Sequence, residues 1–117
     1  MVKYFTNTFL ATKVSFANEM YLICENLGID YDKVVEYATY DERLGKSHWA
    51  VPGPDGKLGF GGSCFPKDIN ALIKVAESMD LDVETLRGAW QTNLEVRPEE
   101  DWKKLIGRAV MEEVEWK

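Results

Sequence analysis

The stretch KYFTNTFLATKVSFANEMYLICENL, residues 3–27, contains neither proline nor glycine and predicts one long helix. Apolar side chains recur in it at heptad spacing in two rows, which are Phe9, Phe16 and Ile23, and Leu10, Ala17 and Cys24. The pairs Met20 with Leu27 and Val14 with Tyr21 widen this apolar surface beyond a single stripe. We therefore expect the helix to be covered on more than one side.

A second, shorter helix is predicted directly after the first. Gly28 ends the long helix, because glycine adopts the left-handed conformation without steric cost. Asp30 then offers a carboxylate cap for a helix over 31–39. The DERLG sequence at 41–45 closes this region.

Residues 46–65 read as one long loop. They are rich in glycine and proline and show no periodic apolar pattern. PDG at 54–56 has the residues of a tight turn. A loop of this length inside a compact domain is typical of a functional segment.

The remaining sequence predicts three more helices and no strand. Pro66 fits the first position of a helix that continues to residue 79, and Asp68 then lies in its first turn. Another helix is expected over 83–94, and a last one opens at Pro98. The apolar residues of the last helix are Trp102, Leu105, Ile106 and Val110. The predicted fold class is all-α, with one long Gly/Pro-rich loop.

Length and charge exclude several classes of protein. The 117 residues predict a single domain over 1–117. Fourteen basic and twenty acidic residues give a net charge of −6 without any basic block, so we expect no nucleic-acid partner. No apolar run approaches the ~20 residues of a membrane span, and the N-terminus lacks a signal-peptide pattern. We therefore expect a cytoplasmic protein.

The two cysteines are predicted to be reduced thiols with different roles. Cys24 lies in an apolar row and reads as an inert, buried residue, as most free cysteines are. Cys64 follows a glycine-rich stretch at the start of a helix, where unpaired N–H groups and the nearby Lys67 favour a thiolate. The glycines would let a substrate approach the backbone closely. Cys64 is therefore the candidate nucleophile.

Two other site types are less consistent with the sequence. GFGGSC resembles the dinucleotide fingerprint GxGxxG, but Cys64 stands where the third glycine belongs and no strand precedes it. His48, the single histidine, lies in the loop without companion ligands and reads as a surface residue. We expect no metal site, since such sites need more clustered ligands.

Three separately placed motifs resemble one known family. They are GFGGSCFPKD at 59–68, KYFTNTFLATKVSFANE at 3–19 and DERLG at 41–45. Together they resemble the central domain of the UDP-glucose 6-dehydrogenase and GDP-mannose 6-dehydrogenase family, over roughly 3–93. This implies a helical fold like that of the 6-phosphogluconate dehydrogenase-like group. Phe65 after the cysteine, together with DERLG, is more similar to the UDP-glucose branch.

The resemblance implies a catalytic group of four residues. Members of the family oxidise the sugar C6 alcohol to a carboxylate with two NAD+ in succession. Cys64 matches the nucleophile that forms a thiohemiacetal and then a thioester. Lys3 and Asn7 match donors to the C6 oxygen, and their i, i+4 spacing places them on one helix face. Asp68 matches the aspartate linked to the hydrolytic water, although its charge opposes thiolate formation at Cys64.

The resemblance also implies substrate-binding residues and partners. Phe60, Gly61 and Gly62 match the loop that lines the sugar pocket. Lys67 is expected to be a substrate-binding residue as well. Arg43 matches an arginine that reaches the UDP-sugar of a neighbouring subunit. A homodimer through the first helix is therefore expected.

Complete members of this family also have an NAD-binding and a UDP-binding domain. Neither pattern is found in these 117 residues, so we expect the chain alone to bind no NAD. Two functions remain open on sequence grounds. The chain is either the catalytic-cysteine domain of a nucleotide-sugar dehydrogenase, of the UDP-glucose or GDP-mannose branch, or a helical dimerisation module with idle site residues.

Overall fold

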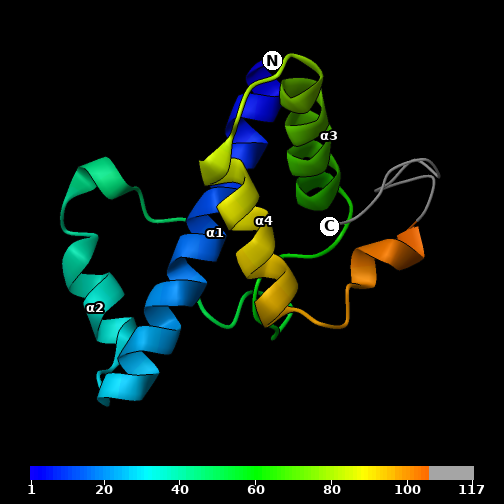
Figure 1. Cartoon of the computed structure of the whole chain (residues 1–117). Coiled ribbons are helices and arrows are strands. Elements are labelled where there is room, and N and C mark those ends of the chain that lie inside the picture. Colours follow the sequence, from blue (N-terminus) through cyan, green and yellow to red (C-terminus); the bar gives the residue numbers. More distant parts are fainter. Residues whose placement is uncertain (106–117) are drawn as a thin grey trace.

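The computed structural model describes residues 1–105 as an assembly of helices (Figure 1). Its elements are α1 (Val2–Leu27), α2 (Tyr31–Ala38), the 3₁₀ helix η1 (Glu42–Leu44), α3 (Cys64–Ser78), α4 (Glu84–Val96) and the 3₁₀ helix η2 (Asp101–Leu105). No strand occurs among these residues, which confirms the all-α prediction for this part of the chain. Within the same range, no helix is both long and apolar enough to cross a bilayer.

The long helix α1 organises the fold. It contacts α2, α3 and α4, and Figure 1 shows α2 on one side of it with α3 and α4 on the other. Gly28 ends α1 with a φ of 69°, and the Ile29 N–H then donates to the Cys24 carbonyl at 2.9 Å. The Asp30 carboxylate accepts from the backbone N–H of Asp32 and Lys33, so both predicted helix signals are confirmed.

Residues 1–105 cover only part of the apolar surface of α1. Ala17 and Cys24, in the second heptad row, are buried. The first row, Phe9, Phe16 and Ile23, is 50–59% exposed. The described residues therefore leave one apolar face of α1 open.

Two apolar clusters form the core. One lies between α1, α3 and α4, and its buried members are Ala11, Phe60, Ile69, Ile73, Ala89, Trp90 and Trp102. The other joins α1 to α2 and the loop through Ala17, Cys24, Tyr31 and Val51. The Tyr31 hydroxyl donates to the Trp49 carbonyl at 2.6 Å, and burial together with the nearby Cys24 and Asp32 raises the Tyr31 pKa to about 12. The long loop is therefore attached to both clusters.

The predicted start of α3 was wrong by two residues. The helix begins at Cys64, so Pro66 is its third residue and Asp68 lies just beyond the first turn. Proline is tolerated there because the first four N–H groups of a helix have no intrahelical partner. Asp68 is fully buried against α1, so its role depends on that contact more than on the helix terminus.

The predicted last helix was also misplaced. Glu100 has a φ of 44°, which interrupts a helix from Pro98, and the 3₁₀ helix η2 begins one residue later. Trp102 is fully buried, as its apolar position suggested. Ile106 and Val110 lie outside the described residues.

The PDG turn is present as predicted. The Gly56 N–H donates to the Gly53 carbonyl at 2.9 Å, and the Lys57 N–H donates to the Asp55 carboxylate at 3.0 Å. Gly56 has a φ of 77°, a conformation that favours glycine. The turn directs the chain back towards the glycine-rich segment at 59–62.

Candidate functional site

Three of the four predicted catalytic residues meet where α1 passes the start of α3. Asn7 Nδ2 donates to Asp68 Oδ2 at 2.7 Å, and Lys3 Nζ lies 3.7 Å from Asp68 Oδ1. Lys3 and Asn7 are one turn apart on α1, so both reach the same carboxylate. The structure therefore joins residues separated by about sixty positions in the sequence.

The Asp68 carboxylate is buried but incompletely paired. Its side chain is fully buried, and Oδ1 accepts no hydrogen bond from any described residue. The ammonium group of Lys3, with a 60% exposed side chain, gives it a charge partner on the solvent side. A buried acceptor without a donor is a position where a water or a substrate hydroxyl can bind.

Cys64 is the first residue of α3 and is exposed, as a nucleophile requires. Its Sγ lies 3.8 Å from the Ser63 hydroxyl. Cys64 and Asp68 are four residues apart, so they share a face of α3. Lys67 is half-buried and forms no ion pair with another described residue, so its influence on Cys64 stays a prediction. Cys24, by contrast, is buried as predicted.

The glycine-rich segment borders a cavity of about 490 Å³. Gly61, Gly62 and His48 are among the residues that line it. A Cβ on Gly62, which has a φ of 72°, would meet no atom within 4 Å. Phe60 is buried in the core, and its N–H and C=O groups both bond Asn93. Phe60 also lines the cavity, but its backbone groups are already bonded, whereas Gly62 has free space at its Cβ position.

Arg43 and His48 lie outside the Lys3, Asn7 and Asp68 group. Arg43 is on η1, which Figure 1 places on the α2 side of α1, and its guanidinium bonds Asp41 at 2.6 Å. This hydrogen bond lowers the pKa of Asp41. His48 is exposed as predicted, with its ring 5.8 Å from that of Phe65. Within residues 1–105 no three His, Cys, Asp or Glu side chains are grouped as metal ligands.

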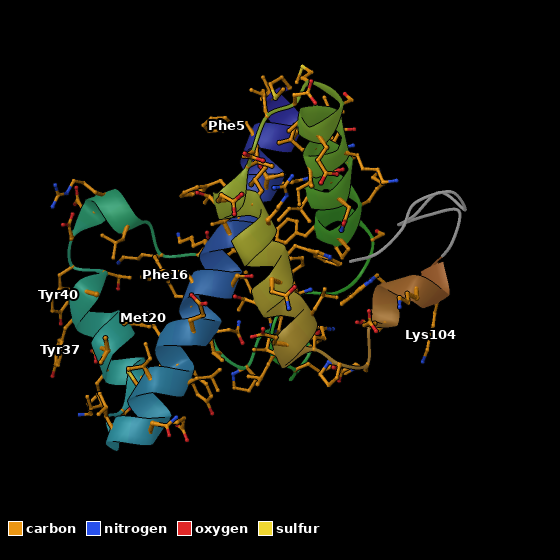
Figure 2. The ribbon with its side chains drawn as sticks, viewed as in Figure 1. Phe5, Phe16, Met20, Tyr37, Tyr40 and Lys104 are labelled. Carbon is orange, nitrogen blue, oxygen red and sulfur yellow. The ribbon has the colours of Figure 1, made fainter. Side chains whose placement is uncertain are left out.

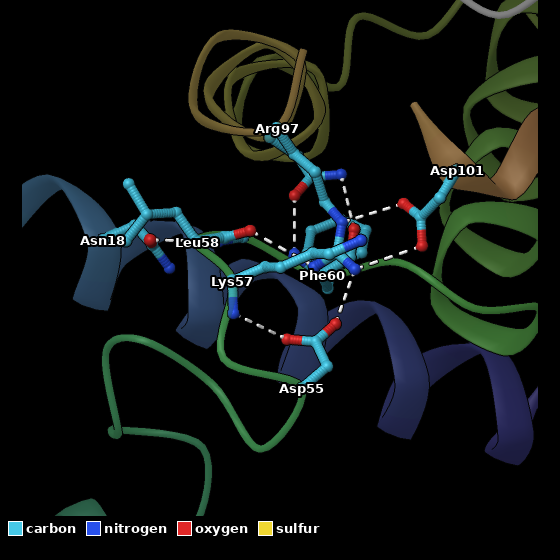
Figure 3. Close-up of polar contacts among 9 residues, drawn as sticks. Asn18, Asp55, Lys57, Leu58, Phe60, Arg97 and Asp101 are labelled. Atoms are coloured by element: carbon cyan, nitrogen blue, oxygen red, sulfur yellow. Dashed lines mark hydrogen bonds and ion pairs between the residues drawn. The ribbon is translucent and has the colours of Figure 1, made fainter. Parts of the chain in front are cut away.

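Polar side chains that the sequence did not single out hold the glycine-rich segment (Figure 3). Asn18 accepts from the Gly59 N–H at 3.0 Å, and Asn93 bonds both backbone groups of Phe60 at 2.7 and 2.9 Å. Arg97 donates to the Leu58 carbonyl at 3.2 Å. The two asparagines could have been found from the sequence. Each lies on the buried face of a helix, where a polar side chain is rare unless it is hydrogen-bonded.

Lys13 is a second missed residue. It is buried on α1, and its Nζ donates to the Leu44 carbonyl at 2.8 Å and lies 4.6 Å from the centre of the Trp49 ring. Desolvation lowers its pKa. Lys13 thereby fixes the segment that carries Arg43 against α1.

Comparison with known proteins identifies the family. A family model described as the UDP-glucose/GDP-mannose dehydrogenase family, central domain, matches residues 1–95. The chain belongs to this family. UDP-glucose 6-dehydrogenase YwqF of Bacillus subtilis is 44% identical over 93 residues, which are 80% of this chain and 20% of that protein. The UDP-glucose 6-dehydrogenase of Pseudomonas aeruginosa is 44% identical over 91 residues, 78% of this chain and 19% of that one.

A solved structure agrees with this assignment. The UDP-glucose dehydrogenase of the hyperthermophilic archaeon Pyrobaculum islandicum matches with a TM-score of 0.73 and 41% identity. The match covers 80% of this chain and 21% of that protein. The chain thus spans about a fifth of the length of these relatives and corresponds to the central domain of the family.

Proposed function

We propose that this chain is the catalytic-cysteine domain of a UDP-glucose 6-dehydrogenase, which converts UDP-glucose to UDP-glucuronate. The observation that carries the proposal is the buried Asp68, paired with Lys3 and Asn7 on the same α3 face as the exposed Cys64. The relatives named UDP-glucose 6-dehydrogenase favour this branch over GDP-mannose oxidation.

The four side chains have complementary roles in the proposed chemistry. The Cys64 thiolate attacks the C6 aldehyde carbon, and the negative charge that develops on oxygen is stabilised by Lys3 and Asn7. Asp68 Oδ1, which lacks a donor among the described residues, accepts a hydrogen bond from the water that later hydrolyses the thioester. Asp68 also keeps Lys3 and Asn7 close together before substrate binds.

The oxidant lies outside this set of residues. The proposed reaction uses two NAD+, but residues 1–105 form no βαβ unit and so do not fit a dinucleotide. The chain alone is therefore expected to produce no NADH from UDP-glucose. Steady NADH production by the pure chain would contradict this expectation.

A homodimer is part of the proposal, with α1 as its interface. Phe5, Phe9, Phe16 and Ile23 on α1 are at least half exposed. Figure 2 shows Phe16 and Met20 on the α2 side of α1, where an apolar groove of about 260 Å³ lies between the two helices. An apolar surface of this extent is typical of an interaction site. The groove and the α1 face would accept the same helix from a second copy.

The nucleophile is tested by alkylation of the native chain. Iodoacetamide at neutral pH should modify Cys64 much faster than Cys24, and faster than a free cysteine in a peptide. Equal, slow rates at both cysteines would favour the alternative, a dimerisation module in which the site residues are idle.

A further inference from the structure

Arg97 is the most completely paired buried cation in the described part of the chain. Its side chain is 2% exposed, and Nε and Nη2 donate to Asp101 at 2.8 and 3.1 Å. Nη2 also bonds Asp55 at 2.5 Å, and Nη1 donates to the Leu58 carbonyl at 3.2 Å. A buried guanidinium is costly unless its donors are satisfied, so these partners fix its position.

These bonds connect three separate segments (Figure 3). Asp55 belongs to the PDG turn, Leu58 leads into the glycine-rich segment, and Asp101 begins η2. Asn93 lies in the last turn of α4, and Arg97 directly follows that helix. The Asn93 side chain holds the backbone of Phe60. We call Arg97, Asn93 and the two aspartates the loop clamp.

The loop clamp explains two glycines of the GFGG sequence. A Cβ on Gly61 would lie 2.6 Å from Arg97 Nη2 and 2.6–2.7 Å from both Asp101 oxygens. A Cβ on Gly59 would overlap the Asn93 amide oxygen. A Cβ on Gly62, by contrast, would be in open space. All three glycines line the cavity, but a side chain at Gly59 or Gly61 would collide with the clamp, while Gly62 alone of the three has free space at its Cβ position.

Part of the clamp lies beyond the matched family region. The family model ends at residue 95, whereas Arg97 and Asp101 follow it. Trp102, fully buried and 5.0 Å from the ring of Trp90, attaches this segment to α4. Arg97, Asp101 and Trp102 are thus part of the support of the cysteine loop.

We propose that Arg97 is a positioning residue for Cys64: it locks residues 58–61 in the conformation that delivers Cys64 to the N-terminus of α3. This inference rests on the proposed function, because it takes Cys64 to be the nucleophile. It predicts that loosening the clamp changes the reactivity of Cys64 without opening the helical core.

The test uses the 117-residue chain with Arg97→Lys and Asp55→Asn. Lysine keeps the charge, but its single nitrogen cannot replace the four bonds that Arg97 makes from three nitrogens of the planar guanidinium. Asp55→Asn is the milder change, because this side chain is 48% exposed. The matched control is Glu77→Gln on α3, which weakens an ion pair of 3.0 Å to Arg87 on α4.

Two measurements are made on each variant. Amide hydrogen exchange at Gly59 and Phe60 should become about tenfold faster in both clamp variants, the scale of one lost charged hydrogen bond, and stay unchanged in the control. Alkylation of Cys64 by iodoacetamide should slow by about two- to fivefold, as the fixed helix N-terminus is lost. Cys24, which is 4% exposed, reports global opening and should react at an unchanged rate.

The possible outcomes separate the claims. Unchanged exchange at Gly59 and Phe60 in both clamp variants would overturn the clamp. Faster exchange with an unchanged Cys64 rate, or a parallel rise at Cys24 in both variants, would overturn the positioning role. A Cys64 in the unaltered chain that reacts no faster than a free cysteine would contradict the proposed function and leave the exchange result standing.

Discussion

Asn7 on α1 and Asp68 on α3 share a hydrogen bond of 2.7 Å between Nδ2 and Oδ2. Among residues 1–105 it is the one hydrogen bond to the Asp68 carboxylate, because Oδ1 has only the Lys3 charge at 3.7 Å. The bond joins the two helices that carry the proposed catalytic residues. It is therefore both a structural contact and part of the site.

Asn7→Leu should destabilise the chain by about 1.5–3 kcal/mol, because it leaves a fully buried carboxylate without a hydrogen bond. Asn26→Leu is the matched control: Asn26 also lies on α1, but its side chain donates to the Leu22 carbonyl on an exposed part of the helix. The control should change stability by about 0.5 kcal/mol or less. Urea unfolding measures both, and equal midpoints for the two variants would show that the Asn7 bond contributes little.

Gly61→Ala should destabilise the chain by about 1–3 kcal/mol, since the new methyl group collides with Arg97 and Asp101. Gly88→Ala should change the stability in the opposite direction. Gly88 lies within α4 with nothing near its Cβ position, so alanine should stabilise by about 0.5–1 kcal/mol. Thermal unfolding of both variants checks the signs. If Gly61→Ala left the unfolding temperature unchanged, the Arg97 and Asp101 side chains would have to shift at little cost, which would contradict a rigid clamp.

Acid should loosen the loop clamp. The hydrogen bond from Arg97 lowers the Asp55 pKa below its ordinary value of 3.8; at Asp101 burial acts in the opposite sense, but Arg97 outweighs it and that pKa is lowered too. Since the folded pKa values lie below the unfolded ones, their stabilisation is present above about pH 4 and is lost as pH falls through the folded values.

The pH dependence is measured by urea unfolding between about pH 6 and pH 3, with Arg97→Met as the comparison. The variant should lose less stability over this range than the unaltered chain, because its aspartates have no partner to lose. Parallel curves for the two proteins would contradict the assignment.

Sedimentation equilibrium should give about twice the chain mass of 13.4 kDa at micromolar concentration. Phe16→Glu should dissociate the pair, because the charge would be buried in an apolar interface. Leu10, in the second heptad row, is half-buried within the chain and is less suitable for this test. The control is Leu81→Glu, a residue of similar exposure (53% against 51%) outside α1. A mass near 13.4 kDa for the unaltered chain would rule out the dimer.

The helices were predictable where local signals act alone. The Gly28 stop and the Asp30 cap depend on nearby backbone groups, and both were correctly placed. The start of α3 was not, because proline fits several positions of a first turn. The segment after Pro98 depends on the docking of Trp102 and on a positive φ at Glu100, neither of which periodicity encodes.

The candidate residues of the site could be named from the sequence, but their contacts could not. The resemblance to the family named Lys3, Asn7, Cys64 and Asp68, and the structure brings Lys3 and Asn7 to Asp68. Arg97 was missed because an arginine after a helix normally reads as a solvated charge, and its burial depends on aspartates from two other segments.

The central claim is that Cys64 is the nucleophile of a UDP-glucose 6-dehydrogenase. It is tested most directly in a chimera in which residues 1–105, including Arg97 and Asp101, replace the corresponding segment of YwqF of Bacillus subtilis, to which the chain is 44% identical over 93 residues. With UDP-glucose and NAD+, the folded chimera should form NADH and UDP-glucuronate, and Cys64→Ser should abolish the acid. UDP-glucuronate formation that survives Cys64→Ser would contradict the account.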